Sequence, residues 1–225
     1  MMVEPDERSF KEALYDEFAR LGKALSSGRR LHILDMLAQG ERTVAELAEA
    51  TGLTPANASQ HLQKLQRTRL VDRRKDGKYV YYRLAGENVY RLCRALREVG
   101  EQQLAEIDRI ADEYRRSRED FAPVDMEELL SRMREGEAEA IDVRPAEEYR
   151  EGHIAGARSV PLEELEARAE ELPSDVEVVA YCRGPYCLLS DKAVKRLREQ
   201  GIEARRLNEG FPDWAAEGYP VEASA

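Results

Sequence analysis

The dipeptide Asp76-Gly77 separates two β-rich runs, residues 70–74 and 78–84, in a half of the chain that otherwise has helical spacing. Asp-Gly between two such runs favours a two-residue β-hairpin turn. Before the hairpin, apolar residues recur three and four positions apart over 10–25 and 31–37. This spacing predicts amphipathic helices. The first half is therefore expected to be mainly helical, with one hairpin.

Two short helices are predicted directly before the hairpin. Thr43-Val-Ala-Glu46 is a capping-box sequence, and the helix it starts is expected to stop at Gly52. Thr54 followed by Pro55 gives a second N-cap and a proline in the first helical position. Two short helices joined by a Gly-containing turn are typical of a helix-turn-helix.

The second of these helices has two distinct faces. Ala58, Leu62 and Leu65 form the apolar face. The other face carries amides, a hydroxyl, an imidazole and an amine, from Asn57, Ser59, Gln60, His61 and Lys64. Such groups can read base edges in a major groove. Taken alone, this helix is equally compatible with an ordinary solvated face.

The hairpin favours the nucleic-acid interpretation because its tip is basic. The basic side chains near the turn are Arg73, Arg74, Lys75 and Lys78. The whole chain has a formal net charge of −10, but residues 54–83 hold eight basic residues and two acidic ones. Phosphate contacts depend on local charge. A helix-turn-helix followed by a basic hairpin is a winged helix, and double-stranded DNA is its expected partner.

The motifs T-V-A-E-L-A, S-Q-H-L-x-x-L and L-V-x-R-R-K-D-G-K-Y-x-Y-Y-R-L resemble the ArsR/SmtB family of winged-helix repressors. The resemblance covers roughly residues 10–115. It implies a homodimer that binds a palindromic operator and is released when an inducer binds. It also implies that Ser59, Gln60 and His61 lie in the DNA-reading helix.

The sequence departs from the metal-sensing members of that family. Residues 43–50 contain no Cys, residues 88–117 contain no His, and the three histidines of the chain are scattered. Neither usual metal site of the family is therefore expected. No cofactor is expected either.

Residues 87–118 carry an apolar stripe and are expected to form one long helix. A solitary helix of about 30 residues needs a partner for such a stripe, and a dimer interface supplies one. Cys93 lies on the stripe. We interpret Cys93 as a buried small hydrophobic residue, with a second redox thiol as the alternative.

The second half of the chain alternates helix and strand patterns after a boundary at Ala122-Pro123. Helices are predicted over 126–133, 162–172 and 188–200, and strands over 138–143, 176–181 and 202–207. Alternation of this kind predicts a mostly parallel sheet covered by helices. We expect two domains, residues 1–120 and 121–225.

Cys182 ends the second of these strands, where sites lie in parallel sheets. The six-residue loop that follows and the next helix N-terminus both offer backbone N–H groups, and Arg183 adds a nearby cation. This environment favours a nucleophilic thiolate at Cys182. A buried structural cysteine is the alternative.

Three motifs in order resemble a rhodanese domain over roughly residues 122–223. They are D-V-R-P-A-E-E-Y-R-E-G-H-I-A-G-A-R-S-V-P at 142–161, the Cys182 loop, and E-G-F-P-D-W-A-A-E-G-Y-P-V at 209–221. The resemblance implies that Cys182 carries sulfane sulfur as a persulfide, and that Arg144 reaches the mouth of the site. The fold is thus expected to be a mainly α winged helix-turn-helix with a β-hairpin wing, followed by an α/β rhodanese-like parallel-sheet domain.

The Cys182 loop also departs from its relatives. The sixth residue after Cys182 is Leu188, whereas the related phosphatases have a loop one residue longer that ends in Arg, so phosphatase activity is disfavoured. Pro185 removes one loop amide. Cys187 is placed either to attack sulfur carried by Cys182 or to serve as a buried cysteine at the helix start.

The leading hypothesis is a homodimeric DNA-binding repressor that senses or processes reactive sulfur through Cys182, Arg183 and Cys187. Its small sulfur donor is thiosulfate, polysulfide or a persulfide. The alternative is a sulfurtransferase whose winged helix serves dimerisation or targeting, and a third possibility is a passive rhodanese module. Three cysteines, no long apolar run and no apolar leader lead us to expect a cytoplasmic protein without a membrane partner.

Overall fold

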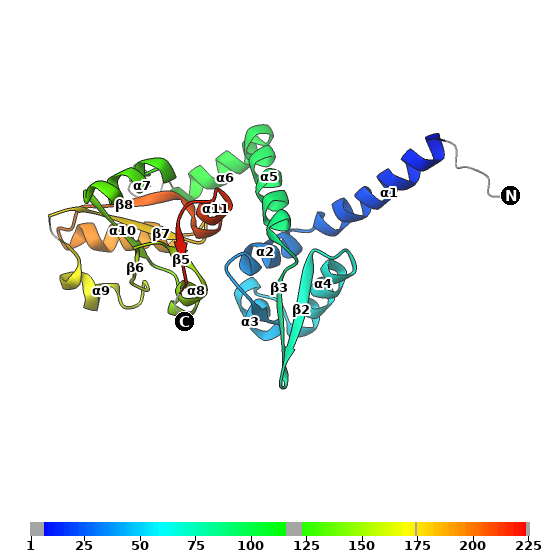
Figure 1. Ribbon diagram of the computed structural model, residues 1–225, viewed down its shortest axis with the longest axis horizontal. Coiled ribbons are helices and arrows are strands. Elements are labelled where there is room, and N and C mark those ends of the chain that lie inside the picture. The colour runs from blue at the N-terminus through cyan, green and yellow to red at the C-terminus, as the bar shows by residue number, and fades with distance from the viewer. Residues whose placement is uncertain (1–6, 116–122, 174, 224–225) are drawn as a thin grey trace. The chain divides into compact units, whose positions relative to one another are not determined.

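The computed structural model describes residues 7–115, 123–173 and 175–223. The chain divides into two compact units, Met1–Arg94 and Ala95–Ala225 (Figure 1). Among the described residues, the first unit contains α1 (Glu7–Leu25), α2 (Gly28–Leu37), β1 (Arg42–Thr43), α3 (Val44–Thr51), α4 (Pro55–Arg67), β2 (Val71–Asp76), β3 (Tyr79–Leu84) and the beginning of α5 (Glu87–Gln103).

The core of the first unit lies where α2, α3 and α4 meet. Ile33, Leu47, Leu62 and Leu65 are completely buried there. Local signals start the two short helices at the positions that the sequence predicts. The Thr43 side chain accepts from the amide of Glu46, whose carboxylate accepts from the Thr43 amide in return. This capping box satisfies amides that the first turn of α3 leaves without intrahelical partners.

The hairpin of the first unit is completed by a short third strand. The sheet order is β1-β3-β2, with antiparallel pairing throughout. Asp76 pairs with Tyr79, so Gly77 and Lys78 form the two-residue turn. Gly77 has φ +58°, a conformation that glycine adopts without steric cost. The predicted hairpin is confirmed, with its turn one residue later than the Asp-Gly dipeptide indicates.

The second unit contains the end of α5 and one four-stranded parallel sheet. Its remaining described elements are α6 (Ala105–Arg115), α7 (Met126–Glu135), β4 (Ala138–Asp142), α8 (Ala146–Glu151), β5 (His153–Ile154), β6 (Arg158–Ser159), α9 (Leu165–Arg168), the 3₁₀ turn η1 (Ala169–Glu171), β7 (Glu177–Cys182), α10 (Leu189–Glu199), β8 (Ala204–Gly210), α11 (Phe211–Ala216) and β9 (Val221–Glu222). The parallel sheet has the order β6-β4-β7-β8, while β5 and β9 form an antiparallel pair.

Strand β7 is central to this sheet, and both of its faces are buried. Val178, Ala180 and Cys182 pack in one hydrophobic cluster with residues of α9 and α10. Val179 and Tyr181 pack in the other cluster with Leu129 of α7 and Trp214 of α11. Two covered faces explain why β7 reads as a continuous apolar run rather than an alternating one. The predicted parallel sheet covered by helices is confirmed.

Two of the predicted helices are wrong in extent. The single helix expected over 87–118 is interrupted at Leu104, between α5 and α6, and its predicted end lies outside the described residues. The break lies beside Gly100, where an added Cβ would come within 3.0 Å of the Ile107 side chain. Glycine therefore leaves the space that Ile107 occupies when α6 turns away from the axis of α5.

The helix predicted over 162–172 is also shorter than expected, because the chain forms only α9 and the tighter turn η1. Leu165, Ala169 and Leu172 are all buried, and the tighter turn still directs the last of them into the core. The strand expected over 202–207 runs instead from Ala204 to Gly210. The boundary predicted between residues 120 and 121 lies outside the described residues and stays a prediction.

Candidate functional site

Helix α4 presents the polar face that the sequence predicts for DNA reading. Thr54 caps the helix by accepting from the Asn57 amide at 3.3 Å, and Pro55 occupies its first position. Because the apolar face packs into the core, the side chains of Asn57, Gln60 and Lys64 are exposed. Ser59 is half-buried, and its hydroxyl accepts from Gln63 Nε2 at 3.5 Å. Amide and amine donors thus lie side by side on an accessible helix, as major-groove reading requires.

His61 is more enclosed than its neighbours on α4. The ring is half-buried, and its Nδ1 atom is buried without a hydrogen-bond partner among the described residues. Burial lowers the pKa of His61, and the nearby cations Arg30, Lys64 and Arg29 lower it further. The imidazole therefore stays neutral at physiological pH, so His61 adds no positive charge to this face.

The wing offers fewer available cations than its sequence suggests. Arg74 donates to the carboxylate of Glu41 at 2.8 and 3.1 Å and to Asp76 at 3.0 Å, and it stacks over the Tyr81 ring. Its guanidinium is therefore already neutralised. The other wing cations, Arg73, Lys75 and Lys78, have exposed side chains.

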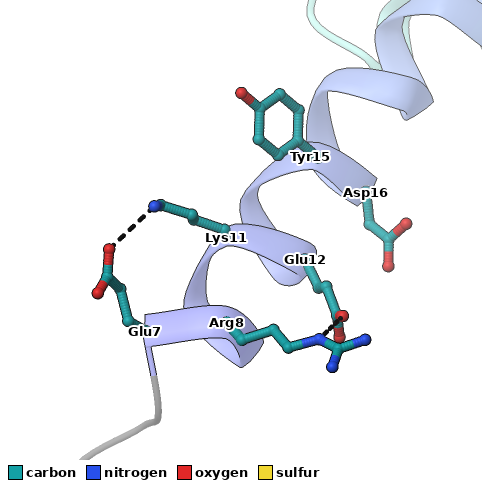
Figure 2. A pocket seen from close by; sticks show the side chains of 6 residues that line it. All are labelled: Glu7, Arg8, Lys11, Glu12, Tyr15 and Asp16. Carbon is teal, nitrogen blue, oxygen red and sulfur yellow. Dashed lines mark hydrogen bonds and ion pairs between the residues drawn. The ribbon is translucent and has the colours of Figure 1, made fainter.

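Figure 2 shows a surface hollow on α1 that is unconnected with either predicted site. Six side chains of this one helix line it: Glu7, Arg8, Lys11, Glu12, Tyr15 and Asp16. Lys11 pairs with Glu7 and Arg8 with Glu12, each one turn apart, and all four side chains are more than half exposed. Such pairs are ordinary helix-surface contacts. We assign no ligand to this hollow, because a single helix encloses nothing.

The cysteine loop of the second unit begins where the sequence predicts. Cys182 is the last residue of β7, and residues 183–188 form the loop before α10. Cys182 and Cys187 are joined by a disulfide with their Cα atoms 6.2 Å apart. Cys182 is 1% exposed, whereas Cys187 is half-buried at the edge of the same hydrophobic cluster. The loop therefore brings together the two cysteines that the sequence singles out.

Arg183 does not supply the free cation that we expect beside Cys182. Its Nη2 donates to Glu148 Oε1 at 2.7 Å, and its Nε donates to Glu148 Oε2 at 3.0 Å. The Glu148 side chain is 3% exposed and the Arg183 side chain 25%. Because a buried carboxylate must be paired, Glu148 fixes the guanidinium toward α8. The Arg183 charge is therefore paired with Glu148, and its predicted role toward the Cys182 sulfur stays a prediction.

Arg144 also departs from its expected place at the mouth of the site. Its side chain is fully buried, forms a bidentate pair with Asp142, and donates to the carbonyl of Gly152 at 2.7 Å. The guanidinium lies over the rings of Phe211 and Tyr181. Every one of these contacts joins segments of the domain, so Arg144 holds the fold together and does not reach the mouth of the site.

Backbone geometry limits the anion-binding capacity of the loop. The amide of Cys187 donates to the carbonyl of Gly184 at 3.0 Å, and Pro185 has no amide hydrogen to offer. The end of strand β8 packs directly against the loop backbone. A Cβ on Gly210 would lie only 2.3 Å from the peptide between Arg183 and Gly184. On the exposed side, the hydroxyl of Tyr186 donates to Glu101 Oε1 at 2.5 Å.

Cys93 is a free thiol in the first unit. It is half-buried and packs against the core of that unit. Burial, followed by the charge of Asp35, raises the pKa of the Cys93 thiol to about 11. A thiol that stays protonated at neutral pH is a poor nucleophile, so these properties fit the interpretation of Cys93 as a small hydrophobic residue.

Two structural absences can be stated for the described part of the chain. No group of three or more His, Cys, Asp or Glu side chains within residues 7–115, 123–173 and 175–223 is arranged to hold a metal ion. None of the helices in those ranges is both long and apolar enough to cross a membrane.

The fold and the site together define the class of protein to which this chain belongs. A helix-turn-helix with a polar second helix and a wing is a DNA-binding module, and the parallel-sheet domain with a cysteine at a strand end is rhodanese-like. The family model for bacterial regulatory proteins of the arsR family matches residues 27–73, and the model for the rhodanese-like domain matches residues 125–217. The class is a transcriptional regulator with a rhodanese-like domain.

One relative matches nearly the whole chain. The HTH-type transcriptional regulator Rv0324 of Mycobacterium tuberculosis is 46% identical over 215 residues, which cover 96% of this chain and 94% of that protein. The chain therefore belongs to the ArsR family of transcriptional regulators, with a rhodanese-like domain on its C-terminal side.

Other relatives match a smaller part of the chain. The uncharacterized protein YqhL of Bacillus subtilis is 40% identical over 34% of this chain and 60% of its own length. A solution structure of a Mycobacterium bovis fragment, described as a homodimeric winged helix-turn-helix DNA-binding domain, is 48% identical. It covers 46% of this chain and 94% of that one, with a TM-score of 0.42.

Three residues that shape these sites were missed from the sequence: Glu41, Glu148 and Gly210. Glu41 and Glu148 pair with arginines 33 and 35 positions away, and no local spacing indicates such a partner. Gly210 carried only a weak signal, because a glycine marks close backbone approach when it falls within a strand, and the predicted strand stops three residues before it.

Proposed function

We propose that this regulator is a homodimeric repressor that responds to reactive sulfur through Cys182 and Cys187. The observation that carries the proposal is the disulfide between these two cysteines, at the strand end where a rhodanese-like domain has its reactive cysteine. A cysteine held against a second cysteine has a built-in resolving thiol, which is an arrangement that redox sensors use.

The chemistry proceeds in two balanced steps. The Cys182 thiolate attacks the sulfane sulfur of a donor, so a persulfide forms on Cys182 and the rest of the donor leaves as an anion. The Cys187 thiolate then attacks the Cys182 sulfur and expels hydrosulfide. The two protein thiols are oxidised to the disulfide, the transferred sulfur is reduced, and no other oxidant is required.

Dimerisation is supported by apolar side chains that α1, α5 and α6 leave in solvent. They include Phe10 and Phe18 on α1, Leu96 and Val99 on α5, and Ile110 on α6, each more than 40% exposed. Large apolar side chains exposed along a helix are typical of an interface. A two-fold dimer would place two copies of α4 on the half-sites of a palindromic operator, with Arg73, Lys75 and Lys78 on the flanking phosphates.

Helix α5 is the element that we propose to carry the signal. It runs without a break from Glu87 to Gln103, and its last turn contributes Glu101, which accepts the hydrogen bond from Tyr186 of the cysteine loop. Formation of the disulfide would change the loop that holds Tyr186. A change in that contact would alter α5, part of the proposed dimer surface.

Operator affinity under defined sulfur states tests the proposal. A DNA duplex selected by the reduced protein from a random library is titrated at fixed salt, with and without inorganic polysulfide. We expect polysulfide to weaken binding by wild type and by the control Cys93→Ser, and to have no effect on Cys182→Ser. Unchanged wild-type affinity would refute sensing. Sulfur turnover by a protein that selects no specific operator would favour a sulfurtransferase. If Cys182→Ser and wild type behaved alike in both operator binding and sulfur turnover, the rhodanese-like domain would be a passive module.

A further inference from the structure

The charges around the cysteine loop bear on which sulfur donor Cys182 accepts. Donors differ in the group that leaves when sulfur is transferred. When thiosulfate gives up its sulfane sulfur, the remainder leaves as the sulfite dianion, so the anionic sulfonate end of the donor must lie in the site during the reaction. A hydropolysulfide or an organic persulfide has no sulfonate. An enzyme or sensor that uses thiosulfate therefore needs cations or amides aimed at that end.

The loop has one cationic side chain, and that side chain is committed elsewhere. Among residues 183–188, Arg183 is the only Lys or Arg. It is held by three hydrogen-bond contacts of 2.7–3.2 Å to Glu148. Releasing Arg183 toward a donor would break its ion pair with the buried Glu148 carboxylate. The guanidinium charge is thus neutralised before a donor arrives.

Two of the six loop residues offer no backbone amide to a donor. Of the loop amides, Pro185 provides none and that of Cys187 is used within the loop. The Tyr186 hydroxyl, the exposed polar group of the loop, donates to the carboxylate of Glu101. A sulfonate approaching from this side meets a negative charge rather than a donor.

We propose that Cys182 takes sulfur from donors without a sulfonate, namely hydropolysulfides and low-molecular-weight organic persulfides, and excludes thiosulfate. The Arg183–Glu148 pair is the specificity determinant. This inference rests on the proposed function, since it names the donor class for the same cysteine.

Donor competition on the full-length reduced protein tests the inference. Thiosulfate, inorganic tetrasulfide and glutathione persulfide are supplied separately, and mass spectrometry follows the added sulfur or the disulfide on the peptide containing Cys182 and Cys187. We expect tetrasulfide and glutathione persulfide to react at least about 100-fold faster than thiosulfate, which is the typical effect of one missing oxyanion donor. Equal rates for thiosulfate and tetrasulfide would overturn the inference.

A gain-of-function variant provides the sharper test. An added side chain at Gly184 meets no atom within 4 Å, and its backbone is not in the left-handed region. Gly184→Lys therefore introduces an uncommitted cation into the loop, and Gly184→Gln is the control of similar length without charge. We expect thiosulfate loading to rise at least about tenfold in the lysine variant only. Equal behaviour of the two variants would overturn the inference.

Breaking the Arg183–Glu148 ion pair is a second way to make a cation available and so to speed thiosulfate loading. Glu148→Gln removes the carboxylate that holds the guanidinium, and the adjacent exposed Glu147→Gln is its matched control. We expect the rate of thiosulfate loading relative to tetrasulfide loading to rise in Glu148→Gln alone. If no donor loads Cys182 in any variant, the proposed function fails together with this inference, whereas loading by thiosulfate alone refutes only the donor class.

Discussion

Reduction of the Cys182–Cys187 disulfide should measurably destabilise the second unit. The bridge closes a short loop, with a sequence separation of 5. The chain-entropy relation for a closed loop of about six residues gives about 2 kcal/mol at room temperature. With a urea m value of about 2 kcal/mol/M, typical for a domain of this size, the unfolding midpoint should fall by about 1 M on reduction.

The fluorescence of Trp214 is well suited to this measurement. It is the only tryptophan of the chain, and it is buried in α11 within the second unit. Urea titrations with and without a phosphine reductant would therefore report on that unit rather than on the winged helix. Cys187→Ser should show the lower midpoint in both conditions, and Cys93→Ser should behave like wild type. Coincident oxidised and reduced curves for wild type would refute the reasoning.

Three further predictions concern the first unit. Thr43→Ala removes the capping box of α3 and should lower the free energy of unfolding by about 1 kcal/mol, measured by helix circular dichroism. Lys75→Ala on the exposed wing should weaken operator binding equally for all sequences and reduce the salt slope by about one, measured by fluorescence anisotropy. In the double variant Cys182→Ser/Cys187→Ser, Cys93 is the remaining thiol, and its raised pKa keeps it protonated at neutral pH. Its alkylation by iodoacetamide should therefore be slow at pH 7 and accelerate until the pH approaches 11. Fast alkylation at pH 7 would contradict this.

The sequence correctly predicted those helix and strand ends that are determined by residues a few positions away. The capping box at Thr43, the Thr54-Pro55 start of α4 and the position of Cys182 at the end of β7 are all found in the structure. Each depends on neighbours within about one helical turn or one strand. These interactions are the ones that sequence spacing encodes directly.

The errors arise where distant residues decide the outcome. Arg183 was expected to add a cation near Cys182, but it pairs with Glu148 on α8, an element too short for its periodicity to be recognised. The break between α5 and α6 depends on packing of Ile107 against Gly100, which an apolar stripe does not reveal. In both cases tertiary contact overrides the local pattern.

The absence of a side chain at position 210 has a consequence for anyone who redesigns this domain. The stem of the reactive loop rests against bare backbone of β8, with no room for even a methyl group. The position of the loop backbone after Cys182 is thus constrained partly by a strand that begins more than fifteen residues downstream of the loop. Grafting residues 182–188 onto another scaffold would transfer the two cysteines but not the backbone of β8 against which their loop packs.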